Sequence, residues 1–344
     1  MPPQAVFVSF RLGGTDGVSI EARKWAWALQ QLGFITRRIA GELPGVAEPG
    51  DVEIPGLTIS PPKHAEPATP AAILDAIGDA TLVVVENLCS LPLNLDAAHA
   101  VAQALDEWEG RVVFHHHDLP WQRAHLVHIT EFPPRRDNSL HVTINALSRE
   151  ELTVRGFQAV TIYNHFNFDG PTGNRDATRQ QFGFLDDDLV VLHPARAIPR
   201  KNVPAALRFV DQLSDLVDNK TVRYWLTGPD EDGYGPTLAQ LLNATTVPYT
   251  IGRGGTPADA YAASDLVVFP STWEGFGNPV LEEITRVGFE FLSVDDPAAV
   301  AERVRSPRDD VLDHNLSVAR EYFDIRDLPN ELRGAFASVG WTEW

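Results

Sequence analysis

Short apolar segments recur along the whole chain, and stretches with helical periodicity separate most of them. In the first half, strands are predicted at 5–9, 34–40, 81–87, 111–117, 140–145 and 159–163, with helices near 70–78, 93–107 and 148–154. In the second half, strands are predicted at 189–195, 222–227, 248–251 and 266–270, with helices at 202–217, 236–243, 257–263, 279–286 and 297–304. Alternation of this kind is typical of a parallel sheet covered by helices on both faces. The fold class is therefore predicted to be α/β.

Two stretches interrupt the alternation. Residues 44–70 carry seven prolines, so we expect an extended surface excursion there and not a regular helix or a central strand. Residues 164–183 are polar and rich in glycine, and the alternation restarts directly after them. Because 344 residues exceed the usual size of one hydrophobic core, we predict two Rossmann-like domains, 1–164 and 165–319, with a cleft between them.

Composition excludes several classes of protein. With 47 acidic and 28 basic residues the net charge is -19, which disfavours non-specific binding to nucleic acid or anionic lipid. No apolar run approaches the roughly 20 residues that cross a bilayer, and the first residues lack the pattern of an export signal. The single Cys89 cannot form an internal disulfide and is expected to be a buried filler. We therefore expect a cytoplasmic protein without a membrane span.

The segment PSTWEGFGNPVLEEITR, residues 270–286, carries the most chemical information. Asn278 is a good helix N-cap and Pro279 suits the first helical position. Glu274 then lies in the turn after a strand, and Glu282 lies about one turn into the helix. For two glutamates alone, the plainer interpretation is a solvated loop acid and an acid favoured by the helix dipole.

The Glu-(seven residues)-Glu spacing with EGFG resembles the signature of retaining GT-B glycosyltransferases, especially glycosyltransferase family 4. The resemblance implies a GT-B fold and a retaining hexosyltransferase. It implies that Glu274 binds hydroxyls of the donor sugar and that Glu282 binds the nucleotide ribose. Further contacts with the donor are implied for Phe276, Gly277 and Asn278. A carboxylate suits these roles because it accepts two hydroxyl hydrogen bonds at once.

A basic turn, HPARAIPRKN at 193–202, resembles a second motif of that family. Arg196 and Lys201 would stabilise the charge of a departing nucleotide diphosphate without a metal. Exposed cations at a surface turn are the alternative. The resemblance also brings the base and ribose of the donor against 226–230, including Gly228, and against 249–254.

The turn GGTDGVS, residues 13–19, combines a helix N-terminus with backbone N–H groups that attract phosphate. The glycines do not form the Gly-x-Gly-x-x-Gly fingerprint of a nicotinamide enzyme. By resemblance, Gly13 and Gly14 would contact donor phosphate or acceptor.

Three histidines end the predicted strand 111–117, and alternation sends His115 and His117 to one side and His116 to the other. In the resembling family a histidine just past this strand reaches the donor sugar, which assigns the role to His117, with His116 as the fallback. Trp121 and Arg123 would line the acceptor side. A metal site is the rival interpretation, but histidines along one strand diverge and no second ligand cluster is evident, so we expect no metal.

Other acids are expected to be structural. The run Asp186, Asp187 and Asp188 precedes a strand and is expected to be solvated, and Asp295 and Asp296 lie in the cap region of a helix. After Arg286 the family pattern has about 15 further residues, including a strand whose loss would leave an unpaired sheet edge. Either this is a natural deletion or a loop is missing from the sequence, and we favour the second.

The resemblance spans nearly the whole chain, and residues 320–344 resemble the C-terminal helices that cross back to the first domain. The sequence thus predicts metal-independent transfer of a sugar from a nucleotide diphosphate sugar to a hydroxyl acceptor, with retention and without a cofactor. The expected acceptor is a soluble sugar or a small polar molecule. The alternatives are a catalytically inactive sugar-nucleotide binding protein, a GT-B sugar-nucleotide epimerase and an NAD-dependent dehydrogenase; the oligomeric state stays open.

Overall fold

The computed structural model describes residues 2–231, 233–272 and 288–344. The chain divides into two compact units. Unit 1 comprises Met1–Phe168 and Arg320–Trp344, and unit 2 comprises Asp169–Ala319. Helix α11 (Asp309–Phe323) carries the chain from the second unit back to the first.

Unit 1 is built on a parallel sheet of seven strands within its described residues, in the order β3-β2-β1-β4-β5-β6-β7. Its strands are β1 (Gln4–Arg11), β2 (Ile35–Glu42), β3 (Val52–Glu53), β4 (Leu82–Glu86), β5 (Arg111–His116), β6 (Ser139–Thr143) and β7 (Ala159–Thr161). The central strands β4 and β5 contain the apolar runs LVVV and VVF and are buried along almost their whole length, because helices cover both faces.

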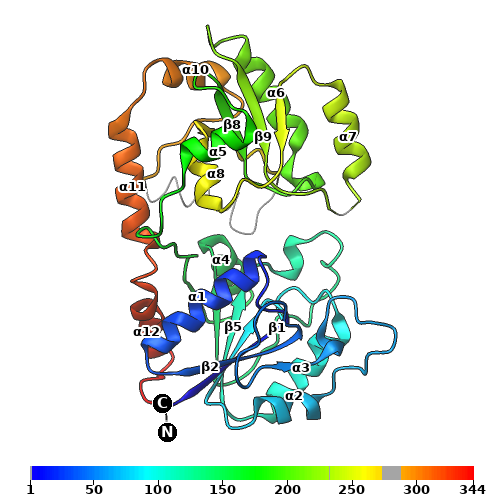
Figure 1. The fold of residues 1–344 in the computed structure, drawn as a ribbon. Helices are drawn as coiled ribbons and strands as arrows, with labels where there is room; N and C mark the ends of the chain where they lie inside the picture. The colour runs from blue at the N-terminus through cyan, green and yellow to red at the C-terminus, as the bar shows by residue number, and fades with distance from the viewer. Residues whose placement is uncertain (1, 232, 273–287) are drawn as a thin grey trace. The chain divides into compact units, whose positions relative to one another are not determined.

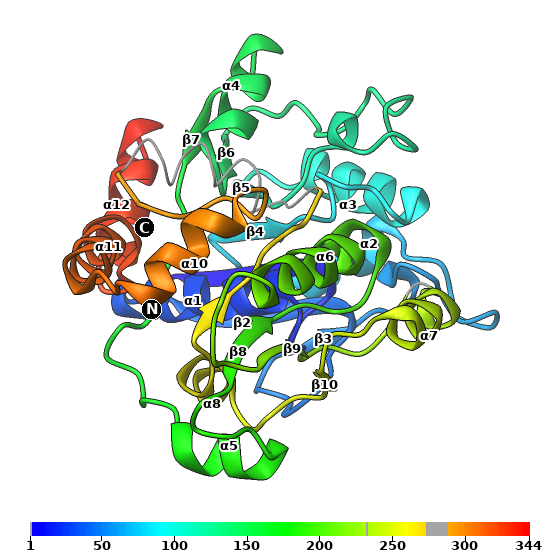
Figure 2. The same cartoon turned by 90° about the horizontal axis from the view of Figure 1, so that it is seen from above.

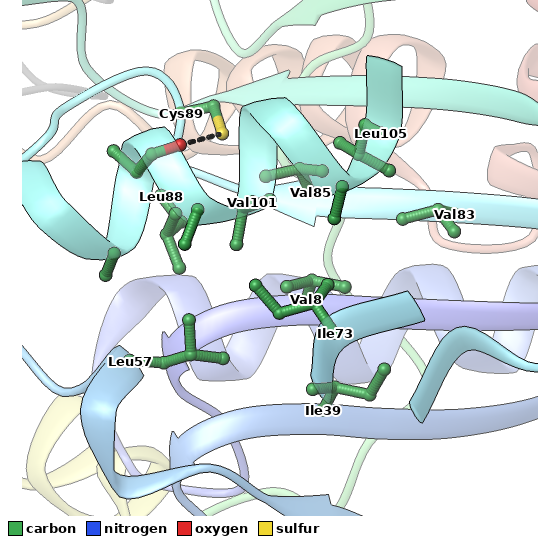
Figure 3. Close-up of a cluster of buried hydrophobic side chains, with 14 of the residues drawn as sticks. Val8, Ile39, Leu57, Ile73, Val83, Val85, Leu88, Cys89, Val101 and Leu105 are labelled. Atoms are coloured by element: carbon green, nitrogen blue, oxygen red, sulfur yellow. Dashed lines mark hydrogen bonds between the residues drawn. The ribbon is translucent and has the colours of Figure 1, made fainter. Parts of the chain in front are cut away.

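Helices α1 (Gly17–Gln31) and α12 (Leu328–Ser338) pack on one face of this sheet, and α2 (Pro70–Ile77) and α3 (Leu95–Glu107) pack on the other (Figure 1). Helix α4 (Ala146–Val154) connects β6 to β7. Figure 3 shows the core under α2 and α3, where alternate residues of β1 and β4, such as Val8 and Val85, meet Ile73 and Val101. Cys89 lies in this core, so the expectation of a buried filler is confirmed.

Unit 2 has a smaller parallel sheet, four strands among its described residues, in the order β10-β9-β8-β11. The strands are β8 (Leu189–His193), β9 (Val222–Leu226), β10 (Tyr249–Ile251) and β11 (Leu266–Val267). Helices α6 (Val203–Ser214), α7 (Gly235–Ala244) and α10 (Pro297–Arg305) share one core with it, and α5 (Arg175–Phe182) and α8 (Pro257–Ala263) cover the other face (Figure 2).

Two predictions about local structure need correction. The polar stretch 164–183 contains helix α5, which Asn174 caps by accepting the N–H of Ala177. The proline-rich excursion adds only the short edge strand β3, which agrees with the prediction that it holds no central strand. Asp188 is buried, and its carboxylate accepts hydrogen bonds from Leu185 N–H and Arg223 Nε. The expectation of a solvated side chain was therefore wrong for this residue.

The helix expected at 279–286 lies outside the described residues, as does Arg286, so the shortening expected there stays a prediction. By contrast, Asp296 caps α10 by accepting the N–H of Ala299 at 3.0 Å, which confirms the expected cap.

Both sheets have a point where the strand order reverses, between β1 and β4 in unit 1 and between β8 and β11 in unit 2. In open parallel sheets, ligands bind beyond the carboxyl ends of the strands at such a point. The residues that follow β1, β4 and β5, and those that follow β8 and β9, are therefore the ones to consider first.

Candidate active site

At the carboxyl edge of the unit 1 sheet, two histidines share one carboxylate. His115 Nδ1 and His117 Nε2 each lie 2.9 Å from Oε2 of Glu86, the last residue of β4. The pairing of β4 with β5 sets this arrangement, because Glu86 lies opposite His115 in the register of the two strands. Glu86 and His115 are fully buried, and His117 is 7% exposed.

The charges in this cluster follow from burial and from the contacts. Burial alone would raise the pKa of Glu86, but the neighbouring imidazoles of His115 and His117 outweigh it and hold the pKa at about 2. Burial lowers the pKa of His115. Burial also acts to lower the pKa of His117, but the hydrogen bond and charge of Glu86 raise it above its ordinary value. Glu86 is therefore ionised, and His117 is the imidazole that best holds the compensating proton.

His116 points to the other face of the sheet. Its Nδ1 lies 2.5 Å from Ser90 Oγ and its Nε2 lies 2.9 Å from His141 Nδ1. Burial lowers the pKa values of His116 and His141, so both rings are neutral at ordinary pH. The predicted alternation of the three histidines is confirmed.

The predicted divergence of these histidines is wrong for one pair. His115 and His117 converge on Glu86, and one ligand atom from each of the three residues lies within 4.8 Å of the others. The 2.9 Å separations are those of direct hydrogen bonds. The expectation of an enzyme without a metal stays a prediction.

The glycine turn after β1 differs from the expected phosphate nest. Asp16 caps α1, and its carboxylate accepts from the Ser19 N–H at 3.0 Å and from Ser19 Oγ at 2.8 Å. Gly13 has φ +88°, and a Cβ there would lie 2.6 Å from the carbonyl oxygen of Pro44. A Cβ on Gly14 would lie 2.8 Å from Asp16 Oδ2. The backbone conformation and the close approach to Pro44 therefore account for Gly13, and a carboxylate already occupies the helix N-terminus. The contact of Gly13 and Gly14 with donor or acceptor stays a prediction.

In unit 2, the basic turn after β8 packs against the turn after β9. Gly228 N–H donates to Ala195 O at 3.0 Å, and Ala197 N–H donates to Pro229 O at 2.9 Å. A Cβ at Gly228 would lie 2.7 Å from the backbone of Arg196, so only glycine permits this approach. Two of the residues predicted to meet the donor are thereby brought together.

Arg196 and Lys201 differ in their surroundings. The Arg196 guanidinium lies 2.5 Å from Glu231 Oε2, and both side chains are more than two-fifths exposed. Lys201 ends a short 3-10 helix, Pro199–Lys201, and is half-buried. An exposed pair of this kind is worth at most about 1 kcal/mol, so an anionic ligand can displace Glu231 from Arg196.

The remaining predicted donor residues, Glu274, Phe276, Gly277, Asn278 and Glu282, lie outside the described residues. The chain that leads to them is described. Asn202 Nδ2 donates to Pro270 O at 3.1 Å, and Thr272 N–H donates to Arg200 O at 2.9 Å. The segment that begins two residues before Glu274 is therefore attached to the basic turn.

A cavity of about 640 Å³ lies in unit 1 beside α4. Trp121 lines this cavity, and the guanidinium of Arg155 lies 3.9 Å from the centroid of its ring. The guanidinium of Arg135 lies 4.1 Å from the ring centroid of Phe157. Arg123 instead pairs with Asp118 at 3.0 Å. Of the two residues predicted on the acceptor side, only Trp121 lines this cavity.

Comparison with known proteins identifies the family. The model of the family described as glycosyl transferases group 1 matches residues 174–288, which include the basic turn and the EGFG segment. Mannosylglucosylglycerate synthase of Petrotoga mobilis is 25% identical, with 80% of this chain and 79% of that protein covered, and that of Thermotoga maritima is 24% identical over 80% and 77%. Over residues 174–288 the chain is thus identified as a member of the glycosyl transferases group 1 family.

Solved structures support the fold of this glycosyltransferase. HepE of Anabaena in complex with UDP-glucose is 16% identical with a TM-score of 0.70, covering 97% of this chain and 99% of that one. Sucrose-phosphate synthase of Thermosynechococcus elongatus is 13% identical with a TM-score of 0.65, covering 98% and 99%. The predicted GT-B fold and the predicted hexosyltransferase are confirmed, and the enzyme transfers a sugar from a nucleotide sugar. None of the helices that the structure describes has the length and apolar character of a membrane span.

Sequence reasoning missed three residues of the site: Glu86, Glu231 and Asp16. A signal existed for Glu86, since an ionisable residue ends the apolar run LVVVE at the carboxyl edge of a buried strand. No comparable pattern marks Glu231, whose meeting with Arg196 depends on the packing of two turns.

Proposed function

We propose that this glycosyltransferase moves a hexose from a nucleotide diphosphate sugar to a hydroxyl of a soluble acceptor, with retention and without a metal. The observation that supports this best is the basic turn of unit 2. Arg196, Lys201 and Gly228 follow the carboxyl ends of β8 and β9, and the turn holds the start of the segment that contains Glu274. In a chain with a net charge of -19, cations gathered at this edge favour a diphosphate ligand.

The proposed roles follow from charge. Arg196 and Lys201 stabilise the negative charge that develops on the leaving diphosphate. Glu274 and Glu282 accept hydrogen bonds from donor hydroxyls, and His117 contacts the donor sugar. The acceptor hydroxyl attacks from the face that the diphosphate leaves, and a diphosphate oxygen takes its proton, so no side chain has to act as a nucleophile.

For the acceptor we propose a sugar acid. The two mannosylglucosylglycerate synthases are named for a product with a glycerate unit, which carries a carboxylate. The cavity beside α4 offers the guanidinium groups of Arg135 and Arg155 together with the ring of Trp121. Guanidinium groups bind carboxylates and aromatic rings stack on sugars, so this cavity suits such an acceptor. In acceptor titrations, Arg155→Ala is expected to raise KM with little change in kcat.

The test is a matrix of donors and acceptors. Mannose and glucose donors, each with a uracil or a guanine base, are incubated with the enzyme alone, with glucosylglycerate and with neutral disaccharides. Nucleotide release that depends on the acceptor, with an α-linked product from an α-linked donor, supports the proposal. A thermal shift without turnover would indicate an inactive binding protein, and donor conversion without acceptor would indicate an epimerase. Loss of transfer on chelation, restored by metal, would contradict metal independence.

A further inference from the structure

We propose that Glu86 is a positioning residue for sugar transfer: by accepting the Nε2–H of His117, it fixes which nitrogen of that ring meets the donor. The inference rests on the proposed function, in which His117 contacts the donor sugar. It adds a residue that the motifs did not indicate.

The hydrogen bonds determine the orientation of the ring. With Nε2 of His117 held 2.9 Å from Glu86, only Nδ1 remains for another partner, and no described residue bonds to it. His117 is also the member of the cluster that reaches solvent, since Glu86 and His115 are fully buried. The available nitrogen therefore lies on the side of the ring away from the carboxylate.

Neighbouring elements hold the cluster still. Trp25 of α1 stacks on His115 with ring centroids 4.1 Å apart, and Asn87 Oδ1 accepts the backbone N–H groups of His117 and Asp118, each at 3.1 Å. Ser9 of β1 donates its hydroxyl to the backbone oxygen of Glu86 at 2.8 Å. Elements β1, β4, β5 and α1 thus all fix the cluster, which is the preorganisation that a catalytic contact requires.

The surrounding charges favour a protonated ring. Glu86 faces His117 from β4, Glu21 faces it from α1 and is paired with Lys24, and Asp118 follows it and is paired with Arg123. The ring of His115 lies with its centroid 4.5 Å from that of His117, and burial lowers the pKa of His115. A protonated His117 donates from Nδ1 to an oxygen of the donor. Without Glu86, burial would favour the neutral ring, and the remaining acids would have to oppose it alone.

The first test needs no substrate. NMR titration of histidine-labelled protein measures the pKa and tautomer of His117, with the signal assigned by His117→Gln. In Glu86→Gln the pKa of His117 is expected to fall by about one unit or more. Ser90→Ala, which removes a partner of His116 on the opposite face, is expected to leave it unchanged. An unchanged titration in Glu86→Gln overturns the proposal.

If Glu86→Gln does not fold, His115→Gln is the second variant. It removes the competing imidazole but keeps Glu86, so the pKa of His117 should stay raised. A fall to the value of an exposed histidine would overturn the proposal.

The purified protein is also analysed for metal. A stoichiometric ion whose removal by chelator changes the His115 and His117 signals would make Glu86 a metal ligand and overturn the positioning role.

The second test uses the pH dependence of kcat. In the wild type, activity should fall as the pH rises through the pKa of His117. Glu86→Gln should move this limb to lower pH and reduce kcat about tenfold at neutral pH, with partial rescue in Glu86→Asp. Unchanged profiles with an altered NMR titration would reject the role in transfer. A wild type without transfer on any donor would reject the proposed function, while the NMR result still decides the Glu86–His117 pair.

Discussion

The two sheets present opposite chemistry at equivalent places. At the strand-order reversal of unit 1, Oε2 of the buried Glu86 lies 2.9 Å from two imidazoles, and of these three side chains only His117 is slightly exposed. At the reversal of unit 2, the side chain of Arg196 is 48% exposed and its guanidinium pairs with Glu231, whose side chain is 41% exposed. The topology is shared and the surroundings differ.

Burial and exposure suit the two regions to different tasks. A buried, hydrogen-bonded charge is costly to disturb, so the unit 1 cluster fixes geometry. An exposed ion pair is worth at most about 1 kcal/mol, so the unit 2 pair can exchange Glu231 for a ligand. One sheet edge is thus suited to positioning a group, and the other to receiving an anion.

The largest effect is expected from removing the unit 2 cations. Arg196→Ala and Lys201→Ala should each lower kcat by about 10²–10³, because each removes charge stabilisation from the leaving diphosphate. Steady-state kinetics with a saturating donor measures this. Arg208→Ala, an exposed arginine on α6, is the control and should be silent. Equal losses in all three variants would show that unit 2 acts only through its overall charge.

The close approach of the two unit 2 turns can be broken separately. Gly228→Ala places a Cβ 2.5 Å from Ala195 O and should destabilise the protein by about 1–3 kcal/mol in urea unfolding. Donor affinity should fall too, since Arg196 moves with the turn. Gly334→Ala in α12 meets nothing within 4 Å and should be neutral or stabilising. Similar stabilities for the two variants would contradict the packing of these turns.

The unit 1 cluster should depend on pH in a defined direction. The pKa of Glu86 is lowered from 4.5 to about 2, so its contribution is present above 4.5 and lost as the pH falls toward 2. The pKa of His117 is raised, so its contribution is complete below 6.5 and is lost as the pH rises through the folded value. Wild type should therefore exceed Glu86→Gln in stability more at about pH 5.5 than at about pH 8.5, by on the order of 1 kcal/mol.

Unfolding of both proteins in urea at the two pH values checks this prediction. Glu302→Gln, which removes an exposed pair with Arg305, provides a control whose effect should hardly change with pH. A wild-type advantage that grows with pH would mean that His117 is neutral in the fold.

The smallest effect is expected at Glu231. Glu231→Gln releases Arg196 from its carboxylate and should tighten donor binding by up to about fivefold, the equivalent of 1 kcal/mol. Calorimetric titration with a nucleoside diphosphate measures it. Weaker binding would show that Glu231 orients Arg196 and does not compete with the ligand, which would remove the contrast between the two sheets.

Local sequence patterns were enough to predict most elements and to locate the motifs that resemble those of the family. Apolar runs and helical periodicity are local properties, so the strands and most helices could be predicted, and the alternation of His115, His116 and His117 followed from the two-residue period of a strand. The turns at 13–19 and 193–202 could be located for the same reason.

The contacts of those residues depend on the fold and could not be predicted from local patterns. Glu86 meets His115 because β4 and β5 pair in one register, Asp16 occupies the helix end that suggested phosphate, and Asp188 is buried against Arg223. Helix α5 escaped prediction because its eight residues are mostly polar and its apolar contacts come from the chain around it. Glu86 and His115, like Asp188 and Arg223, are about 30 or more positions apart, and no local pattern encodes the distance between two strands or turns. At the turn after β1, the pattern suits a capping side chain as well as a phosphate, so it does not tell which of the two binds there.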